Sequence, residues 1–375
     1  MATLNTTNIK HASSSSNNIV LNADGSTTIP NLSVGPNRNK VINGEMKVSQ
    51  RHDTTVQTGK TSSAYYIDRF HLSIDNIGTW SLSQSTDSPD GFSNSFKIDC
   101  TTADASPAGA DHMYLSQKIE GQDLQDLQKG TSSAKTVFLS FYVKSTKTGT
   151  FIAELVDEDN SQRHINKSYT ISNTNWNRYT IEFPGDTTGT LDHDANKSLS
   201  LNFWLASGSN YSSGSLQTSW GADTNANRNV GGTNLADSTS NEFYITGVQL
   251  EVNSVATDFE HRSYGQELAL CQRYYEKITI NGNEIYHFGV NQYGSGGRIP
   301  IFLRVTKRAI PTVTLDADNW TYYVVTGSGS NGNASFNTNS YSTDAIGMTT
   351  TGAGASSTYW AVKSANGYIE ANSEL

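Results

Sequence analysis

The chain has 375 residues, which exceeds the usual length of a single domain, so two or three compact units are expected. Hydrophobic residues make up 35% and charged residues 16%, and much of the remainder is Ser, Thr, Asn and Gly, as is typical of all-β structure with polar loops. The 18 Tyr, 13 Phe and 6 Trp can bury too much surface for a chain that is disordered throughout. A formal net charge of −9 argues against a protein that grips nucleic-acid phosphates, so we expect no nucleic-acid partner.

No stretch of the sequence has the pattern of a membrane span or a secretion signal. Residues 1–30 lack an apolar core flanked by basic residues, and no uncharged apolar run approaches the roughly 20 residues that a membrane span needs. Cys100 and Cys271 are the only cysteines, and we expect two buried thiols rather than a bridge. No membrane insertion is therefore expected, and the thiols are consistent with synthesis in a reducing cytoplasm.

Residues 1–35 form a polar leader. Two β-prone stretches, 19–21 and 27–29, flank an Asp24-Gly25 turn, which predicts a small hairpin. Such a hairpin cannot bury much surface alone, so it needs neighbours from identical chains or from another protein. We expect an extended N-terminal segment for attachment or oligomerisation, and a disordered terminus is the alternative.

Between residues 36 and 262, alternating apolar residues predict strands with one buried face. Gly, Asn and Ser loops separate these strands, which favours two antiparallel sheets packed face to face. The residues that share a face are Val137, Leu139, Phe141 and Val143 in one strand, Leu199, Leu201, Phe203 and Leu205 in a second, and Tyr179, Ile181 and Phe183 in a third.

The last strand of this region leads into the one convincing helix of the sequence. Phe243 and Val248 fall in opposite phases of the strand, so Gly247 is predicted to form a bulge that re-aims it. Ser263 followed by Gln266 predicts a capping box at the start of a linking helix over 263–277. The apolar stripe of that helix consists of Leu268, Cys271 and Tyr275.

Residues 278–375 form a further predicted unit. Ile299, Ile301, Leu303 and Val305 alternate with other residues, which predicts a strand in a C-terminal β domain.

Four motifs are separated along the chain: NKVINGEMKVSQR at 39–51, YYIDRF at 65–70, NEFYITGVQLEV at 241–252 and FEHRSYGQELALCQRYY at 259–275. They resemble, in order, the motifs of a jelly-roll module of bacteriophage tail-fibre and virion structural proteins, of the kind found in marine phages. That module looks like a carbohydrate-binding module. The resemblance spans roughly residues 39–277, and it implies a jelly-roll sandwich and virion membership. It carries no catalytic residues, so no enzyme is expected.

Trp204 is the first candidate for glycan binding. It has the opposite parity to the apolar residues of its strand, so it should point away from the core and offer a stacking platform for a sugar ring. The alternative is that Trp204 lies under a loop or in a subunit contact. Further aromatic candidates are Tyr211 and Trp220 in the long loop that follows, and Trp320 and Tyr322 in the C-terminal unit.

The sequence contains no complete motif for a cofactor, a metal ion or a catalytic site. Alternating Asx residues from Asp223 to Asn229 and from Asp192 to Asn196 resemble calcium loops but lack the terminal bidentate Glu, so no metal and no cofactor are assigned. Many acids are present, but no spacing selects the converging pair of a glycan hydrolase.

We therefore expect a bacteriophage fibre or spike protein that binds a host-surface glycan and is located in the virion, on the tail or the head. Its N-terminal segment would contact other virion proteins. A capsid-decorating or cement protein without a sugar ligand is the alternative, and a tail-borne depolymerase ranks lower. A homotrimer is also expected, with Leu268, Cys271 and Tyr275 in a short helical seam, although the helix could instead cap its own jelly roll.

Overall fold

The structure is a computed structural model that describes twelve stretches of the chain. They are residues 7–9, 19–21, 23, 27–28, 37–280, 287–291, 297–316, 320–324, 332–333, 336–350, 359–364 and 367–375.

Eight strands build an antiparallel sandwich. Four of them pair in the order β8-β16-β10-β13 and the other four in the order β9-β14-β11-β12. Each step along the chain within this set crosses to the opposite sheet, except the β11–β12 hairpin, and this is the topology of a jelly roll. The predicted fold class is confirmed. The bounds are β8 Ser95–Thr102, β9 His112–Glu120, β10 Val137–Ser145, β11 Gly149–Asp157, β12 Arg163–Ile171, β13 Asn177–Phe183, β14 Lys197–Ser207 and β16 Glu242–Val252.

Additional strands widen both sheets. β4 (Gln57–Lys60) and β7 (Thr79–Ser85) complete a six-stranded sheet. β5 (Ala64–Ile67), β6 (Phe70–Asp75) and β15 (Gly221–Ala222) complete a seven-stranded sheet. Short 3-10 turns occur at Gly121–Asp123, Gln125–Leu127, Ser209–Tyr211, Asn225–Asn227 and Leu235–Asp237.

The core lies between the two sheets, where the predicted alternation places it. The rings of Phe141 in one sheet and Phe203 in the other lie 4.9 Å apart at 70°, and both are almost fully buried. Each such side chain contributes about 2 kcal/mol through the apolar surface that it removes from water. Every residue that was predicted to share a buried face in these three strands lies in this core or packs against it.

Gly247 forms the predicted bulge. The pairing of β10 with β16 slips between Ser140 and Tyr142, opposite Gly247, which has φ +62°. A Cβ atom there would approach the rings of Phe92 and Tyr142 to 2.8 Å. Phe243 and Val248 therefore both reach the core although they differ in strand phase.

α1 spans Tyr264–Gln272, with the predicted capping box between Ser263 and Gln266. It is shorter than the predicted helix of 263–277, because the chain enters β17 (Tyr275–Ile280) three residues after α1 ends. The Glu267 carboxylate accepts a hydrogen bond from the backbone N–H of Asn43, so the helix docks on its own sandwich.

The prediction that Leu268, Cys271 and Tyr275 form a helical seam between chains is wrong in two of the three residues. Cys271 is fully buried and Tyr275 is 2% exposed within a single chain. Only Leu268 of the three retains partial exposure. The alternative prediction, in which the helix caps its own jelly roll, agrees with this burial, and neither Cys271 nor Cys100 forms a disulfide.

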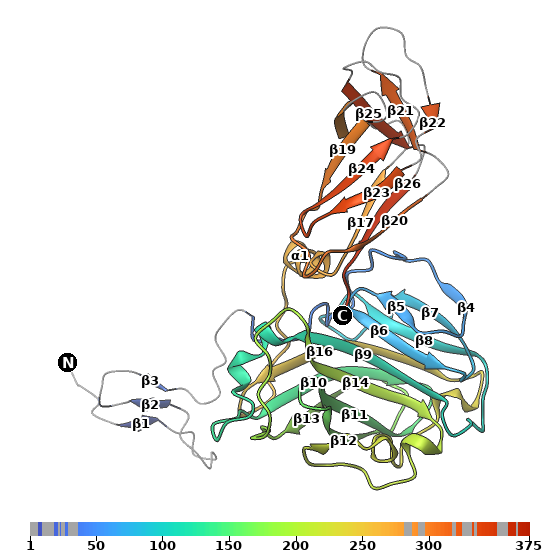
Figure 1. The fold of residues 1–375 in the computed structure, drawn as a ribbon. Coiled ribbons are helices and arrows are strands. Elements are labelled where there is room, and N and C mark those ends of the chain that lie inside the picture. Colours follow the sequence, from blue (N-terminus) through green and yellow to red (C-terminus); the bar gives the residue numbers. More distant parts are fainter. Residues whose placement is uncertain are drawn as a thin grey trace.

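The C-terminal unit is built of β-strands, as predicted. β17 pairs with β26 (Gly367–Asn372), which pairs with β20 (Thr312–Leu315). α1 lies between this unit and the sandwich (Figure 1). The second sheet of the unit has the order β22-β21-β25-β18-β19-β24-β23, with bounds β18 His287–Asn291, β19 Gly297–Phe302, β21 Trp320–Val324, β22 Gly332–Asn333, β23 Phe336–Tyr341, β24 Ala345–Thr350 and β25 Tyr359–Ser364.

The leader contains a small sheet. β2 (Ile19–Leu21) pairs with β3 (Thr27–Thr28), which confirms the predicted hairpin, and β1 (Asn8–Ile9) pairs with β2 on its other edge. Ile9 is 44% exposed and Leu21 is 40% exposed, so this sheet buries little apolar surface within the chain.

Candidate functional site on the outer face of the seven-stranded sheet

The outer face of the seven-stranded sheet is polar. Because side chains alternate between faces, residues paired across neighbouring strands at the same phase lie in rows across the sheet. One such row crosses six strands and ends in two rings. A second row lies two residues along each strand and also contains two rings. The first row is Asn166, Glu154, Asn202, Ser116, His71 and Tyr65, and the second is Ile152, Trp204, Tyr114 and Ser73.

A loop over residues 208–234 covers part of these rows and is held there by an ion pair. Arg228 in the loop donates from Nε and Nη2 to the two carboxylate oxygens of Glu154, at 2.7 and 2.9 Å. Asn202 and Trp204 also donate to Glu154, at 2.8 and 3.1 Å. His164 Nδ1 lies 3.0 Å from the same carboxylate, so this fully buried charge is surrounded by donors.

The pKa of Glu154 reflects two opposed effects. Burial alone raises the pKa of a carboxyl group, because it disfavours the charged form. The charge of Arg228 and the hydrogen bonds from His164, Arg228 and Asn202 outweigh burial and hold the pKa well below its usual range. Glu154 is therefore an ionised anchor for the loop.

Trp204 points away from the core, as its parity predicts, but the prediction that it is exposed is wrong. Its side chain is 1% exposed, because the rings of Tyr211 and Tyr114 lie 5.3 and 4.9 Å from it. The alternative, that Trp204 lies under a loop, is the arrangement in the structure. A sugar cannot stack on Trp204 while the loop stays closed.

Five half-buried rings cross the outer face, and we call them the aromatic strip. Tyr65 and His71 lie 4.9 Å apart at one end. His112 and Tyr114 are stacked at 5.5 Å and 17°, and Tyr211 meets His112 edge-on at 5.1 Å. The strip thus joins strands β5, β6 and β9 with the covering loop.

Small polar side chains form the floor beside the strip. Ser73, Ser116 and Asn202 have exposed fractions of 8%, 3% and 4%. The Ser73 hydroxyl lies 3.3 Å from His112 Nε2. Ring faces beside hydroxyl and amide groups can bind a sugar, whose C–H faces pack on the rings while its hydroxyls form hydrogen bonds.

The other aromatic candidates lie elsewhere or outside the description. Trp220 donates from Nε1 to the Pro184 carbonyl at 2.8 Å, and the Lys129 ammonium lies 5.6 Å from its ring. Trp320 and Tyr322 lie in β21, but their side chains are outside the described residues. Of the five predicted glycan residues, the structure brings together Trp204 and Tyr211.

Sequence reasoning missed four rings of the strip and both charges of the loop anchor. Tyr65 lies in the YYIDRF motif, and Tyr114 has the opposite parity to the core residues of β9, so the same parity argument that selected Trp204 could have found it. The pairing of Glu154 with Arg228 joins residues 74 positions apart, and no local pattern predicts it.

No cluster of three or more His, Cys, Asp or Glu side chains that could hold a metal occurs in the described part of the chain. Of the residues in the two Asx-rich loops, Asp223 lies 3.8 Å from Arg228 and Asn227 accepts a hydrogen bond from the Ser215 N–H. None of the helices described is long and apolar enough to cross a membrane.

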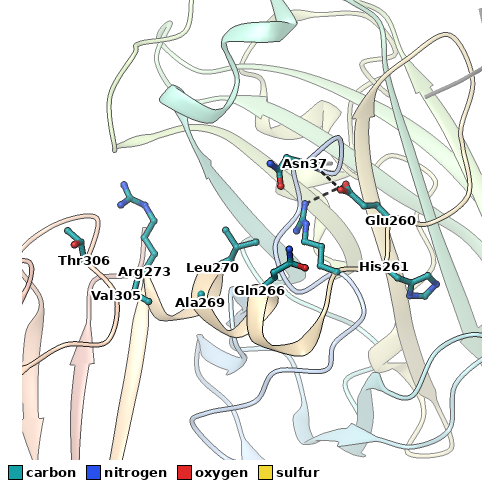
Figure 2. A pocket seen from close by; sticks show the side chains of 10 residues that line it. Asn37, Glu260, His261, Gln266, Ala269, Leu270, Arg273, Val305 and Thr306 are labelled. Carbon is teal, nitrogen blue, oxygen red and sulfur yellow. Dashed lines mark hydrogen bonds and ion pairs between the residues drawn. The ribbon is translucent and has the colours of Figure 1, made fainter. Parts of the chain in front are cut away.

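A cavity of about 600 Å³ lies beside α1, between the sandwich and the C-terminal unit (Figure 2). Ala269, Leu270 and Val305 supply its apolar wall. Its charged residues already have partners, since Glu260 accepts from the Asn37 N–H at 2.6 Å and Arg273 binds Glu120 through two hydrogen bonds. We therefore assign this cavity to the junction between the units.

No family model matches the chain, and none of the curated proteins matches it. Solved structures that are similar include a family 16 carbohydrate-binding module, with 14% identity over 45% of this chain and 84% of that chain and a TM-score of 0.24. A putative sugar-binding protein from Bacteroides thetaiotaomicron is 12% identical, over 57% of this chain and 100% of that chain, with a TM-score of 0.33. A family 11 carbohydrate-binding module from Clostridium thermocellum is 12% identical, over 54% of this chain and 98% of that chain, with a TM-score of 0.29. TM-scores this low do not identify a ligand.

Proposed function

We propose that this protein is a bacteriophage fibre or spike protein that binds a glycan on the host surface through the aromatic strip. The observation that carries glycan binding is the strip itself, in which half-buried rings lie beside a floor of hydroxyl and amide groups. The ordered phage-type motifs of the sequence support location in the virion.

The loop over 208–234 gives the strip one of its rings. Tyr211 lies over Trp204 and against His112, and the ion pair of Arg228 with Glu154 holds the loop in place. A binding surface whose rings are fixed before the ligand arrives loses less entropy on binding. The site would then act as a non-catalytic binding module.

A glycan array tests the proposal, with Tyr114→Ala and Tyr211→Ala as the informative variants. Removal of one stacking ring is expected to weaken binding about tenfold. Tyr264→Ala is the matched control, since Tyr264 is 57% exposed on α1 and lies outside the strip. Binding that both strip variants retain in full, or a complete lack of binding by the intact protein, would contradict this function.

The competing role is that of a capsid-decorating or cement protein without a sugar ligand. Electron microscopy of intact particles separates the two, because a fibre protein is expected on the tail and a decorating protein in a regular array on the head. Release of reducing ends from host polysaccharide would instead reveal a depolymerase.

Attachment through the N-terminal segment and assembly as a homotrimer belong to the same proposal. The exposed Ile9 and Leu21 of the leader sheet motivate both, because such a small sheet needs partners to be stable. Sedimentation equilibrium of the full chain and of a variant that lacks residues 1–36 tests this, and a monomeric full chain would contradict the trimer.

A further inference from the structure

Asp75 lies beside the His112 end of the aromatic strip. It follows His71 and Ser73 along β6 at the period of two that keeps side chains on one face of a strand. His112 of β9 is its direct neighbour across the sheet. Asp75 is the last residue of β6 and is exposed, whereas Ser73 beside it is buried. A ligand on the strip can therefore reach this carboxylate.

The Asp75 carboxylate has no hydrogen bond and no ion pair with any residue that the structure describes. The ring of His112 lies on the same face, but both of its nitrogens face other partners. Its Nδ1 lies 3.1 Å from the Ala110 carbonyl oxygen, and its Nε2 lies 3.3 Å from the Ser73 hydroxyl. Asp75 thus presents an unpaired negative charge beside the strip.

Two cations on the same face are already bound within the chain. Arg228 is paired with Glu154 at 2.7 Å. Lys118 lies near the far end of β9, about 20 Å along the strand, and donates to the main-chain oxygen of Leu375 at 3.1 Å. Neither cation is placed to neutralise Asp75.

The rings near Asp75 add to its effect on a ligand. Tyr211 meets the His112 ring edge-on at 5.1 Å, and Tyr114 stacks on that ring at 5.5 Å. Burial raises the pKa of Tyr211, and the charge of Asp75 contributes in the same direction, so this charge acts on the strip. The face of an aromatic ring also carries a negative potential that attracts cations. This end of the strip therefore favours a ligand with a positive charge.

We propose that Asp75 makes the site selective for glycans that contain a free amino sugar, with the carboxylate binding the sugar ammonium while the sugar ring packs on the aromatic strip. This inference rests on the proposed glycan binding, and it adds the chemical class of the ligand. An N-acetylated sugar brings a neutral amide to the same place, and an acidic sugar brings a charge that Asp75 repels, so both should bind more weakly.

Short oligosaccharides of glucosamine and their N-acetylated forms provide the test, because they share one backbone and differ in charge. Titration calorimetry at neutral pH gives the affinity of the full-length protein for each. The protein is expected to prefer the amine form about fivefold, since an exposed ion pair and a contact between a cation and a ring each contribute modestly. The preference should fall as salt is added.

Two aspartate variants separate position from net charge. Asp75→Asn keeps the shape of the side chain and is expected to bind both forms with equal affinity. Asp90→Asn removes the same charge from an exposed residue in the loop between β7 and β8, two strands of the other sheet, so it should keep the preference. Thermal unfolding of each variant confirms that it is folded, and Asp75→Ser decides the question if Asp75→Asn is not.

The outcomes are distinct for the two levels of the proposal. Binding that depends on Tyr114 and Tyr211 but shows no preference for the amine form overturns the role of Asp75 and leaves glycan binding standing. A preference that survives in Asp75→Asn also overturns it. Hexalysine carries ammonium groups without sugar rings, and equally tight binding of hexalysine that depends on Asp75 overturns the assignment to an amino sugar. Failure of the intact protein to bind any glycan overturns both the inference and the proposed function.

Discussion

Glu154 carries a full negative charge at a position that no water reaches, and its neighbours make this possible. A buried carboxylate is costly unless it is paired and supplied with hydrogen bonds. Arg228, Asn202 and Trp204 supply them, and the result is that one loop is fixed over one end of the outer face. The order of the candidate site thus depends on a single side chain.

Glu154→Gln tests this dependence at almost constant volume. The substitution leaves Arg228 facing a neutral amide, and we expect a loss of about 3 kcal/mol in the free energy of unfolding, because breaking a buried pair strands a charge. Urea unfolding measures the loss. The double variant Glu154→Gln/Arg228→Gln is the control and should recover part of the stability, and an additive double variant would contradict the pairing.

The lowered pKa of His71 leads us to expect that the stability of the protein depends on pH. Burial and the charge of Lys118 lower the pKa of the folded-state ring from 6.5 to about 4, so the unfolded chain binds more protons between these values. Stability should therefore fall as the pH falls from about 6.5 to 4, by at most about 3 kcal/mol. Unfolding of the intact protein and of His71→Gln across this range measures it, and equal pH profiles of the two would refute the prediction.

Among the strands, β16 changes direction at a bulge that a glycine makes possible. Gly247 has a left-handed backbone and lets the rings of Phe92 and Tyr142 approach it closely. The bulge places apolar residues from two strand phases in one core. A local feature of one interior strand therefore decides which of its side chains enter the core.

Gly247→Ala is expected to destabilise the protein by about 2 kcal/mol, because a Cβ atom is strained at this φ and would lie 2.8 Å from two rings. Gly265→Ala is the matched control within α1, where a Cβ atom meets nothing within 4 Å. It should stabilise the helix slightly, by up to about 1 kcal/mol. Denaturant midpoints of the two variants should shift in opposite directions, and a shift in the same direction would contradict the steric account.

For the whole molecule, the last residues described connect the C-terminal unit back to the sandwich. Glu374 follows β26 and bridges Arg51 and Arg69 of the jelly roll. The Arg69 guanidinium lies 3.4 Å from the centre of the Tyr274 ring, and the Arg308 Nη1 donates to the Ala195 carbonyl of the sandwich at 3.1 Å. The unit is therefore held at both ends, through β17 and through the segment after β26.

Glu374→Gln should loosen this connection. It leaves the fully buried Arg69 without its carboxylate, so we expect a loss of about 3 kcal/mol and faster proteolysis between the sandwich and the C-terminal unit. Glu370→Gln is the control, because Glu370 lies in the preceding strand, β26, with a partly exposed side chain 4.0 Å from Lys277, and its loss should cost less than about 1 kcal/mol. Equal rates of proteolysis in the two variants would contradict the role of Glu374 in holding the C-terminal unit to the sandwich.

Patterns within the amino-acid sequence suffice to predict the elements whose cause is local. The jelly-roll strands followed from alternation, the bulge from Gly247 and the start of α1 from Ser263 and Gln266. The pairing of β2 with β3 followed from the Asp-Gly signal in the sequence between them. In each case the residues that cause the feature lie within a few positions of it, so a pattern in the chain is sufficient.

Which faces of the strands and of α1 are covered depends on contacts between distant parts of the chain. Parity placed Trp204 on the outer face, but the loop that buries it is held by Arg228, which is far along the chain from Glu154. The stripe on α1 suggested a seam between chains, yet Cys271 and Tyr275 are buried by their own chain. Burial and ion pairing depend on contacts between distant segments, and the aromatic strip exists because the fold brings such segments together.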